Sequence, residues 1–310
     1  MTSIEVRELS KVYRRTRAVD GIDFSVRPGR VTGFLGPNGA GKSTTMRLIL
    51  GLDRPNSGTA TIGGRRFRDI DRPLRTVGAL LDATAAHPAR TARNHLLALA
   101  AGNRIPTRRV TAVLEEVGLG AVAGRRVRTY SLGMRQRLGI AAALLGDPPV
   151  VMLDEPSNGL DPEGIIWIRE TLRRLAGEGR TVLVSSHLMG ETAAFADHLI
   201  VLGRGRVLAD TALQTFIGDH AQPRVRVRTS DAARLREVLA GAGIEAIEDS
   251  GRWFIHGQRL DRIGPLLAGA GVPVLELADE QASLEQAYLE LTSADSEYVA
   301  TTPALEKAGQ

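Results

Sequence analysis

Hydrophobic residues in the first two thirds of the chain form short runs of strand length, separated by segments with helical spacing. Strands are predicted at 4–9, 21–26, 30–35, 58–62, 76–81, 149–153, 181–185, 198–202 and 207–210. Apolar residues recur every three or four positions from 91 to about 145, and a further helix is predicted at 162–176, where a proline opens it and Gly177 closes it. Buried strands that alternate with helices predict a parallel sheet in an α/β domain.

The pattern changes near residues 218–223, and the last third of the chain has a shorter rhythm. Strands are predicted at 225–228, 244–248, 253–255 and 272–277, and helices at 231–242 and 260–270. The order βαββαβ predicts a small ferredoxin-like α+β domain over residues 224–292. A short amphipathic helix at 283–291 ends this domain, and the tail at 293–310 is predicted to be disordered.

Composition is typical of a soluble globular protein with about two domains. The chain has 310 residues, of which 43% are hydrophobic and 24% charged, and it contains no cysteine. The N-terminus lacks a basic segment followed by an apolar run, so no secretory signal is expected. No apolar run approaches the 18 or so residues of a spanning helix. We therefore expect a cytoplasmic protein.

Basic residues exceed acidic ones, which gives a net charge of +5 and an isoelectric point of about 10.0. Such a balance can indicate nucleic acid or an anionic membrane as a partner. Here the arginines are scattered and acidic residues are plentiful, which favours a coding bias toward arginine. Only Lys11, Lys42 and Lys307 are lysines, so 37 of the 40 basic residues are arginine. No nucleic-acid partner is expected.

A glycine-rich loop follows the strand predicted at 30–35 and precedes a helix predicted at 43–50. It fits the pattern G-x-x-x-x-G-K-[ST], whose main-chain N–H groups surround nucleotide phosphates, with the residues Gly36, Pro37, Asn38, Gly39, Ala40, Gly41, Lys42, Ser43 and Thr44. The glycines let several N–H groups point inward, and the helix N-terminus faces the anion. Lys42 is expected at the β- and γ-phosphates and Ser43 at Mg²⁺. The alternative is an ordinary glycine-rich turn before a helix.

Two further strands deliver polar residues that suit phosphate chemistry. The strand at 149–153 leads to Asp154 and Glu155, and the strand at 181–185 leads to His187. Ligands of open parallel sheets bind at this carboxyl edge. Asp154 is expected to hold Mg²⁺ through water, Glu155 to orient the attacking water, and His187 to bond the γ-phosphate. The alternatives are an acidic turn before a proline and a structural histidine.

A helix that begins after Ser131 offers a second anion site. Ser131 is its predicted N-cap, and the free N–H groups of the first turn are backed by the helix dipole. Taken alone, this is an ordinary capped helix. Whether this helix start binds an anion can be judged only together with the other motifs.

Together these residues resemble the nucleotide-binding subunit of ATP-binding cassette (ABC) transporters, over about residues 1–218. Residues 36–44 match its phosphate loop, 154–155 its second Walker motif, 131–136 its signature, 158–161 its D-loop and His187 its switch histidine. Tyr13, in a turn-like segment, falls where the family stacks an aromatic ring on adenine. The separations agree, since Asp154 follows Ser131 by 23 positions and His187 follows Asp154 by 33.

The resemblance implies an α/β P-loop NTPase with a RecA-like core, an N-terminal antiparallel β subdomain and a helical subdomain at about 88–146. It implies an ATPase with ATP and Mg²⁺ as cofactors. Its catalytic residues would be Glu155 and His187, and its metal ligands Ser43, Asp82 and Asp154. The implied ATP-binding residues are Tyr13, the nine loop residues 36–44, Ser131, Gly133, Met134, Gln136 and Asp161.

Two positions depart from the family pattern. Leu132 stands where the signature usually has glycine, which alters packing but leaves Ser131 and Gly133 in place. Asp82 stands where the Q-loop usually has glutamine. Its carboxylate is shorter and charged, but it can still reach Mg²⁺ or a water bound to it.

The acidic Q-loop, the S-S-H-L run at 185–188 and the C-terminal extension resemble the ATPases of two-domain (ABC-2 type) exporters, including daunorubicin- and bacitracin-resistance proteins. The family implies a homodimer, with each ATP between the phosphate loop of one subunit and residues 131–136 of the other. It also implies a separate integral-membrane permease that exports a drug, antibiotic or lipid-like substrate. The chain would then be peripheral on the inner face of the cell membrane.

A cassette ATPase that acts on ribosomes or nucleic acid without a permease is the main alternative. Relatives of that kind usually carry two cassettes or a long coiled coil, whereas this chain has one phosphate loop and no sustained heptads. The domain at 224–292 also leaves two interpretations open. It is either a ligand-sensing regulatory domain or a prop for the dimer.

Overall fold

The computed structural model describes residues 2–220, 223–280 and 283–293. The chain divides into two compact units, 1–214 and 215–310. The tail predicted to be disordered lies, apart from its first residue, outside the described residues. Among the described residues, no helix is long and apolar enough to cross a membrane.

The first unit is built on a six-stranded sheet with the order β5-β6-β7-β3-β8-β9. Every neighbouring pair is parallel except β8 and β9, which are antiparallel. Its strands are β3 (Arg30–Leu35), β5 (Val77–Leu80), β6 (Val150–Asp154), β7 (Thr181–Ser186), β8 (His198–Gly203) and β9 (Arg206–Ala212). The predicted α/β domain is confirmed.

A second, antiparallel sheet of this unit has the order β2-β1-β4. It contains β1 (Ile4–Tyr13), β2 (Thr16–Val26) and β4 (Ser57–Ile62). The turn-like segment predicted around Tyr13 contains a turn at residues 14–15, while Tyr13 itself ends β1 and pairs with Thr16. Arg14 lies in the left-handed region, with φ 54°, so a two-residue turn forms without glycine or asparagine to announce it.

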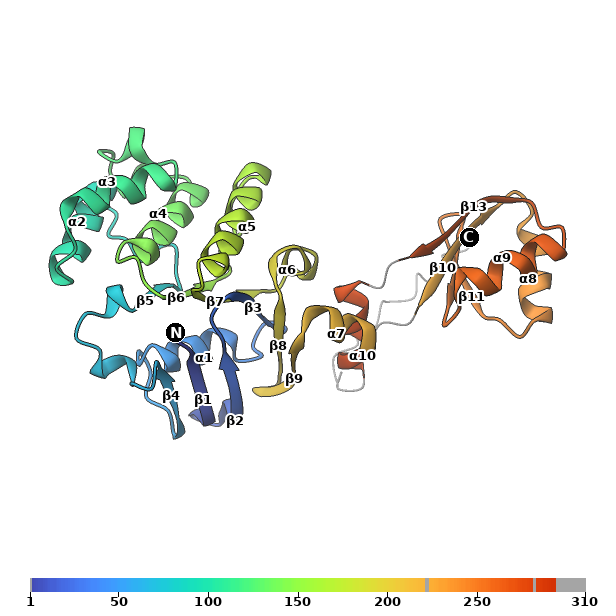
Figure 1. Cartoon of the computed structure of the whole chain (residues 1–310), viewed down its shortest axis with the longest axis horizontal. Helices are drawn as coiled ribbons and strands as arrows, with labels where there is room; N and C mark the ends of the chain where they lie inside the picture. The colour runs from blue at the N-terminus through green and yellow to red at the C-terminus, as the bar shows by residue number, and fades with distance from the viewer. Residues whose placement is uncertain (1, 221–222, 281–282, 294–310) are drawn as a thin grey trace, which may run out of the picture. The chain divides into compact units, whose positions relative to one another are not determined.

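Helices cover both faces of the six-stranded sheet (Figure 1). They are α1 (Lys42–Ile49), α2 (Ala92–Gly102), α3 (Thr107–Glu116), α4 (Leu132–Leu144), α5 (Pro162–Gly177) and α6 (Met189–Phe195). Figure 1 shows α2 to α5 on one side, and α1 with the antiparallel sheet on the other. A buried apolar core fills the space around α1, with Phe34, Met46 and Ile200 among its members.

Helix α4 packs directly on β5, because a glycine faces it. A Cβ atom at Gly78 would lie 1.9 Å from the carbonyl oxygen of Ala143, near the end of α4. At Gly139, a Cβ would lie 2.5 Å from a methyl group of Leu80. The missing side chains therefore fix how closely the helix approaches the strand.

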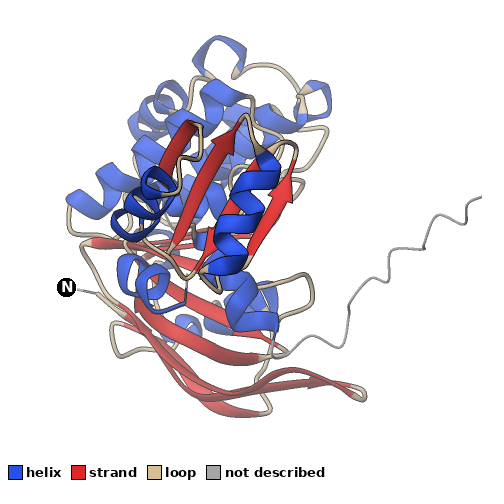
Figure 2. Cartoon of the chain, turned by 90° about the vertical axis from the view of Figure 1, so that its right-hand side faces the viewer, coloured by secondary structure: helices blue, strands red, loops and turns tan. Residues whose placement is uncertain are grey.

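The second unit has an antiparallel sheet with the order β11-β12-β10-β13. The predicted order of elements is confirmed, with β10 (Arg224–Thr229), α8 (Ala232–Gly241), β11 (Ala246–Asp249), β12 (Arg252–His256), α9 (Leu260–Gly269), β13 (Val274–Glu280) and α10 (Leu284–Ser293). Val225, Val227 and Leu235 belong to its own core. Figure 2 colours helices blue and strands red. Helix α7 (Leu213–His220), which the sequence pattern did not predict, contains the boundary predicted at 218.

Candidate functional site

The glycine-rich loop joins the end of β3 to the start of α1, as the sequence predicts. Gly36 and Gly41 have positive φ angles of 153° and 104°. A Cβ at Gly36 would lie 2.5 Å from the carbonyl oxygen of Leu202, and one at Gly41 equally close to that of Ala18. Only glycine fits at these two positions, so the loop is held in an open curve with the N-terminus of α1 at its end.

Lys42 is the first residue of α1 and is only 7% exposed. Its Nζ donates hydrogen bonds to the carbonyl oxygens of Gly36 at 2.5 Å and Pro37 at 3.3 Å. Burial lowers the pKa of Lys42, and the nearby Glu155 and Asp154 oppose that shift. The ammonium is thus held inside the loop, where a phosphate can replace the carbonyl groups as its partner.

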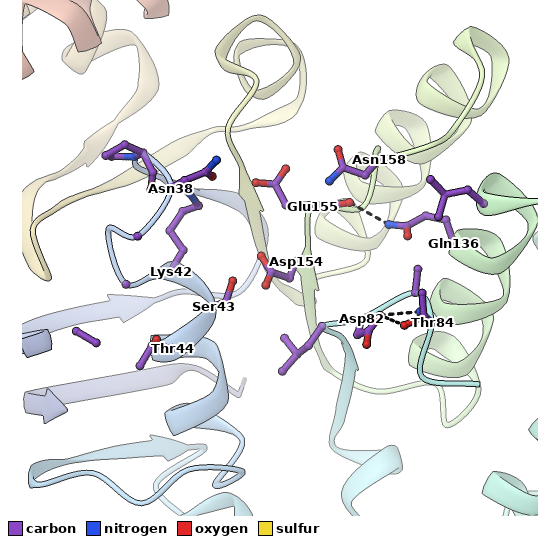
Figure 3. Close-up of a pocket in the computed structure, with 17 residues that line it drawn as sticks. Asn38, Lys42, Ser43, Thr44, Asp82, Thr84, Gln136, Asp154, Glu155 and Asn158 are labelled. Atoms are coloured by element: carbon purple, nitrogen blue, oxygen red, sulfur yellow. Dashed lines mark hydrogen bonds between the residues drawn. The ribbon is translucent and has the colours of Figure 1, made fainter. Parts of the chain in front are cut away.

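A cavity of about 640 Å³ opens over the loop (Figure 3). It brings together most of the predicted site, namely Pro37, Asn38, Gly39, Gly41, Lys42, Ser43, Thr44, Asp82, Gln136, Asp154 and Glu155. Ala18, Thr84, Leu132 and Asn158 also line it. Segments separated by more than a hundred residues in sequence therefore line the same cavity, as expected at the carboxyl edge of a parallel sheet.

Asp154 ends β6, and its carboxylate accepts a hydrogen bond from the hydroxyl of the buried Ser185 on β7. This bond occupies Oδ1 and leaves Oδ2 available. Figure 3 shows the Ser43 hydroxyl and the Asp154 carboxylate on the same cavity. Sequence reasoning had placed Ser185 at the strand end but had given it no role.

Glu155 is held through three different groups. Its N–H donates to the Oγ of Ser185 at 3.0 Å, and its carbonyl oxygen accepts from Nε2 of Gln136 at 2.9 Å. Its Oε2 lies 2.8 Å from Nδ1 of His187. The backbone of Glu155 has φ 49°, a left-handed conformation that costs free energy in a residue with a Cβ.

Asp82 lies on the opposite wall of the cavity, after β5. Its Oδ1 accepts hydrogen bonds from both the N–H and the hydroxyl of Thr84, each at 2.7 Å. These bonds lower the pKa of Asp82, so the carboxylate is ionised at neutral pH. Thr84 was not identified from the sequence, although a threonine two residues after an aspartate is typical of a local turn.

The predicted signature segment starts α4. Ser131 is exposed, and its Oγ accepts the N–H of Met134 at 3.2 Å, which confirms the predicted N-cap. Gly133 faces the turn before α5, because a Cβ there would lie 2.7 Å from the carbonyl oxygen of Gly159. Gln136 differs from these residues. It is 3% exposed and bonds Glu155 of the same chain.

The D-loop segment leads into α5. Asp161 is the N-cap of this helix, and its Oδ1 accepts the N–H of Gly164 at 3.0 Å. It is exposed and does not line the cavity.

Tyr13 also lies outside the cavity lining. Its hydroxyl donates to Asp53 at 2.7 Å, and the Nζ of Lys11 lies 4.8 Å from its ring centroid. Asp53 also accepts from Nε of Arg47 on α1 at 2.8 Å. These bonds to Arg47 and Tyr13 lower the pKa of Asp53 to about 2. The ring is thus tied to the helix that follows the phosphate loop.

The oxygen donors at the cavity suit Mg²⁺. Carboxylates and a hydroxyl are the ligands this ion prefers, and it usually takes only one or two from the protein together with phosphates and waters. Ser43, Asp82 and Asp154 supply such groups. In the part of the chain that the structure describes, no three acidic or histidine side chains gather as an all-protein metal site.

Family models match both parts of the chain. Residues 19–158 match the model described as ABC transporter, and residues 223–285 match a domain of unknown function. The second match adds no role for the C-terminal unit.

Whole-length relatives and a solved structure agree with the first match. The chain is 35% identical to the bacitracin transport ATP-binding protein BcrA of Bacillus licheniformis, covering 94% of this chain and 97% of that protein. It is 32% identical to the daunorubicin resistance ATP-binding protein DrrA3 of Streptomyces coeruleorubidus, covering 95% and 97%. A dimeric bacterial ABC transporter cassette is 25% identical, with a TM-score of 0.63 over 68% of this chain and 98% of that one. The chain therefore belongs to the ATP-binding subunits of ABC transporters, related to those of antibiotic exporters, and it is an ATPase that binds and hydrolyses ATP.

Proposed function

We propose that ATP hydrolysis by this chain energises export of a drug, antibiotic or lipid-like substrate through a separate membrane permease. The observation that carries this proposal is the match over nearly the whole length, C-terminal unit included, to proteins named for bacitracin transport and daunorubicin resistance. In this proposal the path for the substrate lies in the permease, a second polypeptide. The chain then works at the inner face of the cell membrane.

The cavity residues take the roles that their positions suit. The N–H groups of residues 36–44 surround the phosphates, and Lys42 exchanges its carbonyl partners for phosphate oxygens. Ser43, Asp82 and Asp154 would hold Mg²⁺. When bound, Mg²⁺ neutralises charge on the phosphate oxygens.

Glu155 and His187 form the hydrolytic pair. Their side chains are hydrogen-bonded at 2.8 Å, so each restricts the orientation of the other. Glu155 points into the cavity (Figure 3), where its carboxylate orients the attacking water and accepts a proton from it. His187 bonds the γ-phosphate. Most of the rate enhancement then comes from positioning and charge stabilisation.

The working form is a homodimer with two equal sites. A twofold axis places the same surface on both subunits. The residues Ser131, Gly133, Met134 and Asp161 are exposed or half-buried. In the proposed dimer they face the nucleotide of the second subunit. Tyr13 stacks on the adenine. Leu132, 53% exposed on the cavity wall, adds apolar surface to this interface.

The two units have recognisable arrangements. The first is a P-loop NTPase with a RecA-like core, and α2 to α4 form its helical subdomain. In the second, numbering the strands along the chain gives the spatial order 4-1-3-2, the order of a ferredoxin-like domain. Its two helices and four strands form a core of their own, which supports an accessory domain.

Co-expression tests the transporter proposal. The neighbouring genes are searched for a hydrophobic membrane protein, the chain is expressed with and without it, and membranes are washed in high salt. We expect the chain to stay on the membrane only when that protein is present, and its ATPase rate to change on binding. A chain that instead sediments with ribosomes, in a salt-sensitive complex, would refute the proposal in favour of a permease-free ATPase.

A further inference from the structure

We propose that Gln136 is a positioning residue, which holds the main chain of Glu155 in the hydrolytic conformation within its own subunit. The sequence alone placed Gln136 at the nucleotide of the second subunit. Its contacts point instead to the Walker glutamate of the same chain. This inference rests on the proposed role of Glu155 in hydrolysis.

The carbonyl of Glu155 is the partner of the Gln136 amide. Nε2 of Gln136 lies 2.9 Å from that oxygen, a normal hydrogen-bond distance (Figure 3). Gln136 is 3% exposed, whereas Ser131 and Leu132 at the start of the same helix are exposed. A buried amide that turned toward another subunit would leave the Glu155 carbonyl without this partner. The bond is therefore expected to persist when ATP binds.

Glu155 needs such a bond because its backbone is strained. With φ 49° it occupies a region that residues with a Cβ adopt rarely, and only where the surroundings fix it. Ser185 on β7 holds its N–H, Gln136 on α4 holds its carbonyl, and His187 holds its carboxylate. The same carbonyl also accepts the N–H of Asn158 at 3.2 Å, but that bond lies within the turn that follows Glu155. Gln136 is the partner that ties the carbonyl to helix α4. Without it the peptide is held less firmly, and the carboxylate gains freedom to move.

Helix α4 can serve as the support because it packs closely on β5. Gly78 and Gly139 bring α4 and β5 into contact, with no space for even a Cβ at either position. The same contact sets the distance between Gln136 and the end of β6, because β5 pairs with β6 along its length. Small displacements of a catalytic group cost large factors in rate, so this rigidity has a kinetic consequence.

Kinetics of the homodimer provide the first test. Gln136→Leu keeps the volume of the side chain but removes the donor. We expect kcat to fall about tenfold, equivalent to about 1.4 kcal/mol in the barrier, and ATP affinity to change less than twofold. Affinity is measured with fluorescent ATP in EDTA, where turnover is prevented. A weaker affinity with unchanged kcat would overturn the proposal.

Two further variants separate positioning from simple loss of stability. Thr181→Val removes a buried hydroxyl at the start of β7, outside the cavity, that donates to the carbonyl oxygen of Thr2 at 2.6 Å, and it should lower the melting temperature without lowering kcat. Gln136→Glu can donate to the carbonyl only when protonated. Its kcat relative to the wild-type protein should therefore rise as pH falls from 8 to 6. A ratio that does not change with pH, or a fall in kcat for Thr181→Val, would contradict the positioning role.

Mixed dimers distinguish action within a subunit from action across the interface. The reference dimer has one wild-type subunit and one Glu155→Gln subunit. If Gln136 acts within its own subunit, a dimer with Gln136→Leu in one subunit and Glu155→Gln in the other is slower than the reference. Placing both changes in one subunit then leaves the reference rate. The opposite order would refute the proposal. Turnover by the Glu155→Gln homodimer would instead refute the role of Glu155.

Discussion

Gly78→Ala tests how strongly the contact between α4 and β5 matters. The added Cβ would lie 1.9 Å from the carbonyl oxygen of Ala143 and 2.7 Å from its carbon. An ordinary contact needs at least about 3.3 Å, so α4 and β5 must separate by more than an ångström. Neither atom of Ala143 belongs to a flexible side chain, and both elements are buried in the first unit. The strain cannot be relieved locally.

The expected cost is about 3 kcal/mol, at the upper end for overpacking in a core. In a unit of this size 1 kcal/mol shifts the melting temperature by about 2–4 °C, so a decrease of about 6–12 °C is expected. ATPase activity should fall as well, because the displaced helix carries Gln136. Gly177→Ala, at the end of α5 with no atom within 4 Å of its Cβ, is the matched control and should stay within about 1 kcal/mol.

Tryptophan fluorescence can follow the first unit alone. The chain has two tryptophans, Trp167 on α5 and Trp253 on β12. In a Trp253→Phe background, thermal unfolding monitored by Trp167 reports on the unit that contains Gly78 and avoids treating two domains as one transition. A Gly78→Ala protein within 0.5 kcal/mol of its background, with normal turnover, would refute the reasoning.

Two other predictions concern the same unit. Ser185→Ala removes the hydroxyl that bonds both the Asp154 carboxylate and the Glu155 N–H. It should therefore raise the Mg²⁺ concentration needed for half-maximal turnover and lower kcat. A titration of ATPase activity with Mg²⁺ measures both effects. The pKa of Asp53 is lowered to about 2, so its interactions stabilise the fold above about pH 4 and are lost as pH falls toward 2. The free energy of unfolding of Asp53→Asn, taken from melting curves, should therefore differ little from that of the wild type at pH 2. At pH 7 it should be lower by at most about 1 kcal/mol, since Arg47 is exposed. A difference that grows toward low pH would contradict this prediction.

The fold could be predicted largely because local signals and tertiary packing agree. The strand that ends in Asp154 is a continuous apolar run, as expected when both faces of a strand are buried. The loop at 36–44 could be predicted from its glycines, and the structure has no space for a Cβ at Gly36 or Gly41. The hairpin around Tyr13 was predicted only in part, because the strands expected at 4–9 and 21–26 extend to Tyr13 and back to Thr16, which leaves a turn of two arginines.

The site was predicted in part, because a motif names residues without saying which way they point. Asp154, Glu155 and Lys42 line the cavity as expected for strand and helix ends. Gln136 belongs to the same motif as Ser131 but lies more than one helical turn further along α4. At that point the helix directs its side chain into the core, where it is buried. Ser185 could have been suspected from its place at the end of β7. Its bond to Asp154, however, depends on which strands are neighbours, and sequence spacing does not give that.

The scarcity of lysine has a consequence for chemical labelling. An amine-reactive reagent finds only three lysine side chains and the N-terminal amine in this chain, and the two lysines that the structure describes differ sharply. Lys11 is partly exposed, while Lys42 is buried in the phosphate loop with a lowered pKa, which favours its reactive neutral form. Because Lys42 is buried, its acylation depends on access to the loop. A bound nucleotide should shield Lys42 from the reagent. The fraction of Lys42 that is acylated, measured by mass spectrometry, therefore reports how much of the site is occupied in the intact transporter.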